Sequence, residues 1–222
     1  MLRTETVERT TFELLKTLMQ DEILKQFNLV GGTALALYMG HRKSIDLDLF
    51  SHQTFDATIL ANHLNSAYGF VNTYPEQDSK LILVGKINDI KLDCVWNDSL
   101  QIKPVCSYGG IRIASIDDIA AMKLKAILQN GTRLKDFVDI AFMSKKMPLK
   151  TMLNVFDKKY PSTSKLLAVK SLTYFDDIDF TTKIELTEGV FNWDKIEARL
   201  NEMVINPNKT FFHYPIEMDS SC

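Results

Sequence analysis

The spacing of apolar residues changes between the two halves of the chain. Apolar residues that recur every three to four positions predict amphipathic helices, whereas strict alternation and short apolar runs predict strands. The first half contains both patterns, with predicted strands at 27–30, 44–50, 81–84, 90–96 and 111–113 and predicted helices at 5–26, 33–39 and 55–68. The second half shows helical spacing, at 115–129, 132–146, 149–160, 164–172 and 193–204.

This change of pattern predicts an α+β fold with two domains. Residues 1–114 are expected to form a small mixed β-sheet with flanking helices, and residues 115–222 a mainly α-helical domain. The boundary is placed at Ser115, since a serine followed by acidic residues in the first turn is typical of a helix start.

The composition is that of an ordinary globular chain. The 222 residues are 45% hydrophobic and 24% charged with a net charge of -2, which supports a sizeable core and excludes disordered and fibrous classes. No apolar run approaches the roughly 18 residues of a membrane helix, and the first residues do not resemble a secretory signal, so we expect a cytoplasmic protein without a membrane partner. The three cysteines, Cys94, Cys106 and Cys222, have no CxxC spacing and are expected to be reduced thiols.

Two aspartates, Asp46 and Asp48, alternate with apolar residues on the predicted strand 44–50. Their side chains therefore project from one face, about 6 to 7 Å apart. Aspartate is disfavoured in strands and like charges repel each other, so a cation between the two carboxylates would stabilise them. Hard oxygen ligands suit Mg²⁺ or Mn²⁺, although a solvent-facing edge strand with alternating acids would give the same pattern.

The sequence Gly31-Gly32-Thr33 turns the preceding predicted strand into a helix. Amides at a helix N-terminus bind phosphate, glycine allows close backbone approach, and the Thr33 hydroxyl can donate to a phosphate oxygen. A plain turn followed by a helix cap is the structural alternative. Arg42, shortly before the acidic strand, is a second candidate for phosphate binding and would otherwise lie on a surface loop.

Asp93 on the predicted strand 90–96 is a candidate third carboxylate. Three carboxylates can hold two metal ions that organise in-line displacement at phosphorus. Asp93 would then also accept the proton of the attacking hydroxyl. Lys91 lies on the same strand face, so an ion pair between Lys91 and Asp93 is the alternative interpretation.

These motifs resemble those of a known superfamily. A Gly-Gly-Thr turn, twelve intervening residues and an Asp-Leu-Asp strand, with Asp93 on a later strand, resemble the nucleotidyltransferases of the DNA polymerase β superfamily. More narrowly, three segments together resemble the AbiEii/AbiGii toxin family of bacterial abortive-infection and toxin–antitoxin systems: 31–50, 122–143 and 171–177.

The resemblance implies a nucleotidyltransferase lobe, a helical C-terminal lobe and a nucleotide in the cleft. It implies an enzyme that uses a nucleoside triphosphate to extend or block the 3′ end of tRNA, beside a separate antitoxin protein. By position, Asp46 and Asp48 match the metal-binding pair, Asp93 the third carboxylate, and the Gly31-Gly32-Thr33 turn the phosphate-binding site.

The segment 122–143 adds candidates from the second half. By resemblance to the family, Lys123 would neutralise triphosphate charge and Asp136 would position Lys123 or Arg133, with Lys125 and Lys135 as nearby alternatives. A solvated helix face with ion pairs is the structural alternative. Bases outnumber acids from 123 to 150, which indicates a candidate RNA-facing surface.

Three aromatic residues, Tyr174, Phe175 and Trp193, are candidates to stack bases, with a helical core as the alternative. Asp176 and Asp177 belong to the family-like segment 171–177, and their chemistry gives them no assigned role.

The resulting hypothesis is a metal-dependent nucleotidyltransferase that passes a nucleoside monophosphate to an acceptor hydroxyl, with a tRNA 3′ end as the expected acceptor. The alternatives are a non-catalytic nucleotide-binding regulatory module and a phosphotransferase that uses the same acidic pair. The chain has neither a Walker A ending nor a protein-kinase HRD block, which disfavours the phosphotransferase.

Overall fold

The computed structural model describes residues 1–73 and 81–217 and divides into two compact units. The first unit consists of Met1–Tyr38, Ser44–Ser99 and Pro104–Ala114. The second consists of Met39–Lys43, Leu100–Lys103 and Ser115–Cys222. The domain limits 1–114 and 115–222 remain our proposal, from which the compact units differ by two short segments.

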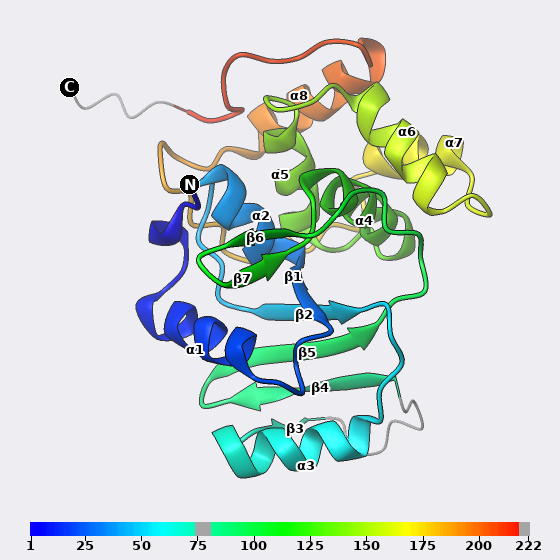
Figure 1. Ribbon diagram of the computed structural model, residues 1–222. Helices are drawn as coiled ribbons and strands as arrows, with labels where there is room; N and C mark the ends of the chain where they lie inside the picture. Colours follow the sequence, from blue (N-terminus) through cyan, green and yellow to red (C-terminus); the bar gives the residue numbers. More distant parts are fainter. Residues whose placement is uncertain (74–80, 218–222) are drawn as a thin grey trace. The chain divides into compact units, whose positions relative to one another are not determined.

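The first unit is built on a seven-stranded mixed sheet (Figure 1). The strand order is β3-β4-β5-β2-β1-β7-β6. The β2–β5 and β1–β7 pairs are parallel, and the other neighbours are antiparallel. The strands are β1 (Phe27–Val30), β2 (Leu47–Ser51), β3 (Val71–Asn72), β4 (Ile82–Ile87), β5 (Ile90–Trp96), β6 (Cys106–Tyr108) and β7 (Ile111–Ile113).

Helices flank this sheet within the first unit, where α1 packs against β7 and α3 against β4. Their bounds are η1 (Thr4–Thr6), α1 (Arg9–Gln20), α2 (Gly31–Met39) and α3 (Ala57–Tyr68). The predicted helix 5–26 is shorter than expected at both ends. At Asp21 the side chain accepts a 2.8 Å hydrogen bond from the Ile23 amide, a local turn that competes with further helix.

The second unit is mainly helical. Its helix α4 packs against α5, α6 and α7, and α5 packs against α8. Ser115 caps α4 as predicted, since its hydroxyl accepts a hydrogen bond from the Asp118 amide. The helices are α4 (Ile116–Gln129), α5 (Leu134–Met143), α6 (Leu149–Lys159), α7 (Lys165–Leu172) and α8 (Trp193–Ile205). Within the ranges that the structure describes, no helix is long and apolar enough to cross a membrane.

A buried ion pair explains why the segment Leu100–Lys103 belongs to the second unit. The Asp118 carboxylate accepts hydrogen bonds from the amides of Ile102 and Lys103. Lys159, whose side chain is 2% exposed, lies 2.8 Å from Asp118 and also donates to the carbonyl of Leu100. A charge-assisted network of this kind holds the segment where hydrophobic patterning alone indicates only a loop.

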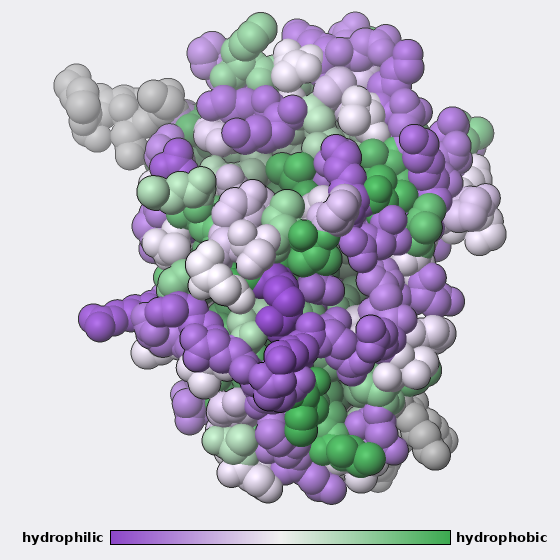
Figure 2. Space-filling view, viewed as in Figure 1, coloured by the Kyte–Doolittle hydropathy of each residue, from purple (hydrophilic) through white to green (hydrophobic). Residues whose placement is uncertain are grey.

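The α+β fold is therefore confirmed, with the predicted strands in the first half and helices in the second. On the face shown in Figure 2, hydrophobic side chains form small groups among hydrophilic ones. Cys94 and Cys106 are free thiols as expected, and Cys222 lies outside the described residues.

Candidate active site

The glycine turn and the acidic strand meet directly. Strands β1 and β2 pair antiparallel, which places Val30 opposite Asp48. The next residue, Gly31, has a φ of +69°, and a Cβ built on it would lie 2.1 Å from Oδ2 of Asp48. Glycine is therefore required here twice, for its left-handed backbone and for the space that the carboxylate occupies.

The Thr33 side chain fixes the entry to the acidic strand. Its buried hydroxyl donates to the backbone carbonyl of Asp46 and lies 2.9 Å from Oγ of Ser44. A hydroxyl carries one proton, so Ser44 donates to Thr33 while Thr33 donates to Asp46. The hydroxyl that the sequence suggested for phosphate is thus engaged with the segment just before β2.

Strands β2 and β5 bring the third carboxylate beside the pair. They run parallel with Asp48 opposite Asp93. Alternation along β2 and β5 then places Asp48, Lys91 and Asp93 on one face of the sheet. Asp46 comes just before β2, close enough for its charge to act on Lys91. The opposite face is buried and apolar, with Leu47, Leu49, Leu92 and Cys94.

Lys91 forms the ion pair with Asp93 that the sequence left open. Its Nζ donates to Oδ2 of Asp93 at 2.7 Å. Partial burial disfavours the ammonium, but the carboxylates of Asp93, Asp48 and Asp46 together hold the pKa of Lys91 above its usual range. The positive charge of Lys91 therefore lies in the field of all three acids.

That three carboxylates hold two metal ions stays a prediction. Among the described residues, no group of three or more histidine, cysteine or acidic side chains is placed to hold a metal ion. At Asp93, Lys91 donates to Oδ2, while Oδ1 is buried without a hydrogen-bond partner in the described part of the chain. Asp48 on β2 and Asp46 just before it suit one divalent cation, because both are hard oxygen donors.

The second unit holds a separate buried cluster centred on Asp139. Arg42 contacts both of its oxygens, Nε to Oδ1 at 2.7 Å and Nη2 to Oδ2 at 2.9 Å. His41 lies 2.8 Å from Oδ1, and Lys123 lies 2.7 Å from Oδ2. Lys123 also donates to Asp136 at 2.6 Å.

The structure thus brings Lys123 and Asp136 together, and it places Arg42 with them. Lys123 is only 6% exposed and Arg42 only 2%, so neither the solvated helix face nor the surface loop describes them. Burial alone would raise the pKa of Asp139, but Arg42 and Lys123 hold it well below the usual range. Burial lowers the pKa of His41, which is therefore neutral near pH 7.

Sequence reasoning missed Asp139 as the centre of this cluster. A signal was present, since Asp136 and Asp139 are three residues apart and so share one face of α5. Two carboxylates buried on one helix face need cations. The chain supplies one from α4 and one from Met39–Lys43, a pairing that no local pattern reveals.

Fewer of the basic residues from 123 to 150 are available to contact RNA than their number in the sequence suggested. Besides buried Lys123, Lys125 donates to the Thr163 hydroxyl at 3.0 Å, and the ammonium of Lys145 lies 4.0 Å from the centre of the Tyr214 ring. The exposed bases in this range are Arg133, Lys146 and Lys150. The prediction of an RNA-facing surface therefore depends on a smaller set.

The three aromatic candidates differ in burial: two pack in a core and one is exposed. Phe175 and Trp193 pack edge to face at 5.4 Å, and both contact the buried Phe137, as the core interpretation expected. Tyr174, by contrast, is 50% exposed. Asp176 and Asp177 are exposed, and nothing in their surroundings assigns them a role.

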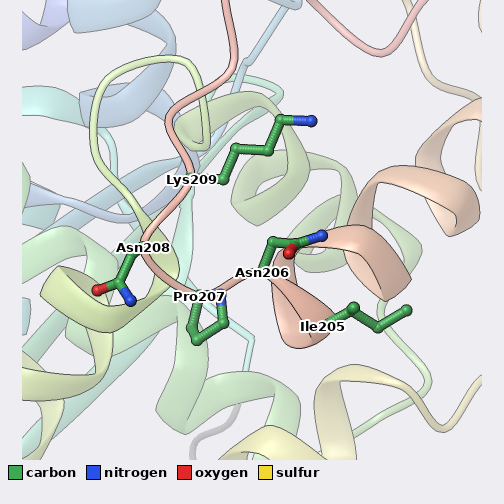
Figure 3. Close-up of a pocket in the computed structure, with 5 residues that line it drawn as sticks. All are labelled: Ile205, Asn206, Pro207, Asn208 and Lys209. Carbon is green, nitrogen blue, oxygen red and sulfur yellow. The ribbon is translucent and has the colours of Figure 1, made fainter.

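A pocket of about 490 Å³ follows the end of α8 (Figure 3). Its lining is the continuous segment Ile205, Asn206, Pro207, Asn208 and Lys209. None of the predicted site residues lines it, and the Lys209 ammonium is paired with Glu202. This pocket is therefore not the candidate active site.

Comparison with solved structures shows which proteins share the fold. The chain resembles the crystal structure of JHP933 from Helicobacter pylori, with a TM-score of 0.52 and 20% identity, covering 91% of this chain and 93% of that one. It also resembles a candidate nucleotidyltransferase from H. pylori, with a TM-score of 0.54 and 20% identity, covering 90% of this chain and 96% of that one. The fold is that of a nucleotidyltransferase.

Comparison of sequences identifies the family. The model of the family described as "Nucleotidyl transferase AbiEii toxin, Type IV TA system" matches residues 13–209. The chain belongs to this family and is a nucleotidyltransferase. It is also 33% identical over 191 residues to the uncharacterized protein aq_aa25 of Aquifex aeolicus (strain VF5), a match that covers 83% of this chain and 89% of the relative.

Proposed function

We propose that this enzyme transfers a nucleoside monophosphate from a nucleoside triphosphate to a tRNA 3′-terminal hydroxyl and releases pyrophosphate. We further propose that it acts as a toxin restrained by a cognate antitoxin protein in the cytoplasm. The family description supports the toxin role. The observation that carries the chemistry is the seating of the Asp48 carboxylate against the Gly31 turn, which joins an acidic strand to a helix N-terminus.

In this proposal each element of the first unit has a task. Asp46 and Asp48 hold one Mg²⁺ or Mn²⁺, which supplies positive charge to the reacting phosphoryl group. The amides at the start of α2, including those of Gly32 and Thr33, bind phosphate oxygens, because amides in the first turn of a helix have no partner within the helix. Asp93 accepts the proton of the attacking hydroxyl.

The buried cluster of the second unit is proposed to support nucleotide binding. Its two buried cations, Arg42 and Lys123, balance the buried Asp136 and Asp139 while His41 is neutral, and the exposed Arg133 lies 3.6 Å from Oδ2 of Asp136. The cluster therefore has a structural role, since its ion pairs hold these side chains in one arrangement. A phosphate-binding role for Lys123 predicts that Lys123→Met raises the KM for the triphosphate by more than its loss of stability explains.

The central experiment incubates the purified protein and Mg²⁺ with total tRNA and each α-³²P-labelled triphosphate in turn. The control is Asp46→Asn/Asp48→Asn, which preserves the size of both side chains. Label on tRNA with the wild type and not with the control would support the proposal and identify the base. Label on tRNA with both proteins would refute the metal-site assignment.

Two other outcomes would favour the alternatives. Triphosphate binding without label transfer to any acceptor would favour a regulatory module. Transfer of label from γ-³²P-labelled triphosphate, with release of a nucleoside diphosphate, would favour a phosphotransferase, because nucleotidyl transfer releases the γ-phosphate within pyrophosphate.

A further inference from the structure

Lys91 is the positive member of a four-residue group at one face of the sheet. The parallel register sets Asp48 opposite Asp93, and alternation along β5 adds Lys91 to the same face. Asp46, just before β2, lies close enough for its charge to act on Lys91. The Lys91 ammonium is 2.7 Å from Oδ2 of Asp93, while its side chain remains 45% exposed. We call Asp46, Asp48, Asp93 and Lys91 the acidic quartet.

The charges of the quartet determine how many cations it needs. Three carboxylates and one ammonium leave a net charge of two negative units, which one divalent cation balances. A second divalent cation would need Asp93, whose Oδ1 is buried and whose Oδ2 the ammonium occupies. An exposed lysine stem can swing away at modest cost, so a metal ion and Lys91 are in competition rather than mutually exclusive.

We propose that Lys91 is an internal counter-cation of the active site that competes with divalent metal for Asp93 and limits the resting site to one metal ion. This inference rests on the proposed function in one respect, namely that Asp46 and Asp48 bind a divalent cation. It assigns Lys91 a role in metal affinity and stoichiometry, beyond a surface ion pair.

The expected effect follows from Coulomb's law. A unit charge about 6 Å from a divalent ion, the spacing of next-nearest residues on a strand face, changes the ion's affinity by roughly tenfold in water and by about threefold after screening at ~0.15 M salt. Removal of the Lys91 charge should therefore tighten metal binding by about threefold to tenfold. Release of Asp93 as a ligand would add to this effect.

The chain offers a matched control in Lys86. It is exposed, on β4, and paired in register with Lys91, so it lies on the same face one strand farther from the acids. Lys86→Met removes the same charge at about twice the distance, where screening leaves an effect of less than about twofold. Lys91→Arg keeps the charge and serves as the conservative variant.

The experiment measures Mn²⁺ binding by electron paramagnetic resonance of the free ion, with no nucleotide and no turnover. The proteins are the wild type, Lys91→Met, Lys86→Met, Lys91→Arg and Asp46→Asn/Asp48→Asn, each checked for folding by circular dichroism. We expect about one ion per wild-type chain, tighter binding by Lys91→Met of at least about threefold, and affinities of Lys86→Met and Lys91→Arg close to the wild type.

The remaining outcomes separate this inference from the proposed function. Unchanged or weaker binding by Lys91→Met, or an equal gain in Lys86→Met, would overturn the role of Lys91 while leaving the metal site intact. Two ions per wild-type chain would also overturn it. Binding that is absent from every variant, or unaffected in Asp46→Asn/Asp48→Asn, would overturn the metal site and with it both proposals.

Discussion

Gly31→Ala tests the junction between the glycine turn and the acidic strand. A Cβ at this position would lie 2.1 Å from Oδ2 and 2.9 Å from Cγ of Asp48, whereas ordinary contacts begin near 3.4 Å. The Asp48 carboxylate would have to move by about 1 Å, a misplacement that can reduce catalysis by about 100-fold. The φ of +69° adds about 1 to 2 kcal/mol of backbone strain for alanine.

Gly69→Ala separates these two effects. Gly69 ends α3 with the same φ of +69°, but a Cβ there meets nothing within 4 Å. We therefore expect both variants to lose about 1 to 2 kcal/mol of unfolding free energy in urea titrations. Gly31→Ala alone should also lose about 100-fold in nucleotide transfer and show weaker Mn²⁺ binding.

The comparison can refute the reasoning directly. Equal activity and equal Mn²⁺ affinity in the two alanine variants would mean that Asp48 is not held against the turn in a way that matters for the chemistry. A stability loss in Gly31→Ala that far exceeds the loss in Gly69→Ala would mean that the close approach serves folding instead.

Three further predictions address the remaining charges and hydrogen bonds. Asp139→Asn leaves two buried cations without their shared carboxylate and should cost about 3 to 5 kcal/mol of unfolding free energy, whereas Glu202→Gln at an exposed pair should cost less than about 1 kcal/mol. Burial lowers the pKa of His41 from its ordinary 6.5, so below pH 6.5 the unfolded chain binds a proton at His41 that the folded chain does not bind. The free energy of unfolding should therefore fall below pH 6.5 by up to about 1.4 kcal/mol per pH unit, and His41→Gln should reduce this slope. Thr33→Val removes the hydrogen bond to the Asp46 carbonyl and should weaken Mn²⁺ binding, whereas Thr33→Ser should preserve it.

Each of these has an outcome that would contradict it. If Asp139→Asn lowered the free energy of unfolding by less than about 1 kcal/mol, Arg42 and Lys123 would be hydrated in the variant and the carboxylate would not be needed to keep them buried. A pH slope that is the same in wild type and His41→Gln would assign the proton uptake elsewhere. Equal Mn²⁺ affinity in the valine and serine variants would deny Thr33 a positioning role.

The local pattern was sufficient for much of the fold. Alternation along 44–50 predicted a half-buried strand, and burial confirms it from Leu47 onward, where Leu47 and Leu49 face the core and Asp48 does not. The predicted start at Ser44 was wrong, since β2 begins at Leu47 and Ile45 is 51% exposed. Ser115 marked the start of a helix, and the Gly31-Gly32 pair marked the turn into α2. These features depend on side-chain period and backbone freedom within a few residues, which any short segment already contains.

Other elements were beyond the local pattern. Strand β6 (Cys106–Tyr108) carries little apolar signal and exists because β7 pairs with it. Residues 21–26 continued a helical pattern, yet the Asp21 side chain formed a turn with the Ile23 amide. In both places a hydrogen bond outweighed a weak preference.

For the site, the sequence by itself determined the chemical groups: a paired carboxylate strand, a glycine turn and a conspicuous lysine–aspartate segment on helices. Only the tertiary structure decided their partners, namely that Asp48 packs on Gly31, that Lys91 holds Asp93, and that Asp139 gathers Arg42 and Lys123. The physical reason is the distance along the sequence over which the interacting residues are separated. Strand faces and helix starts follow from neighbouring residues, whereas the partner of a charge depends on strand register and packing between residues up to 97 positions apart.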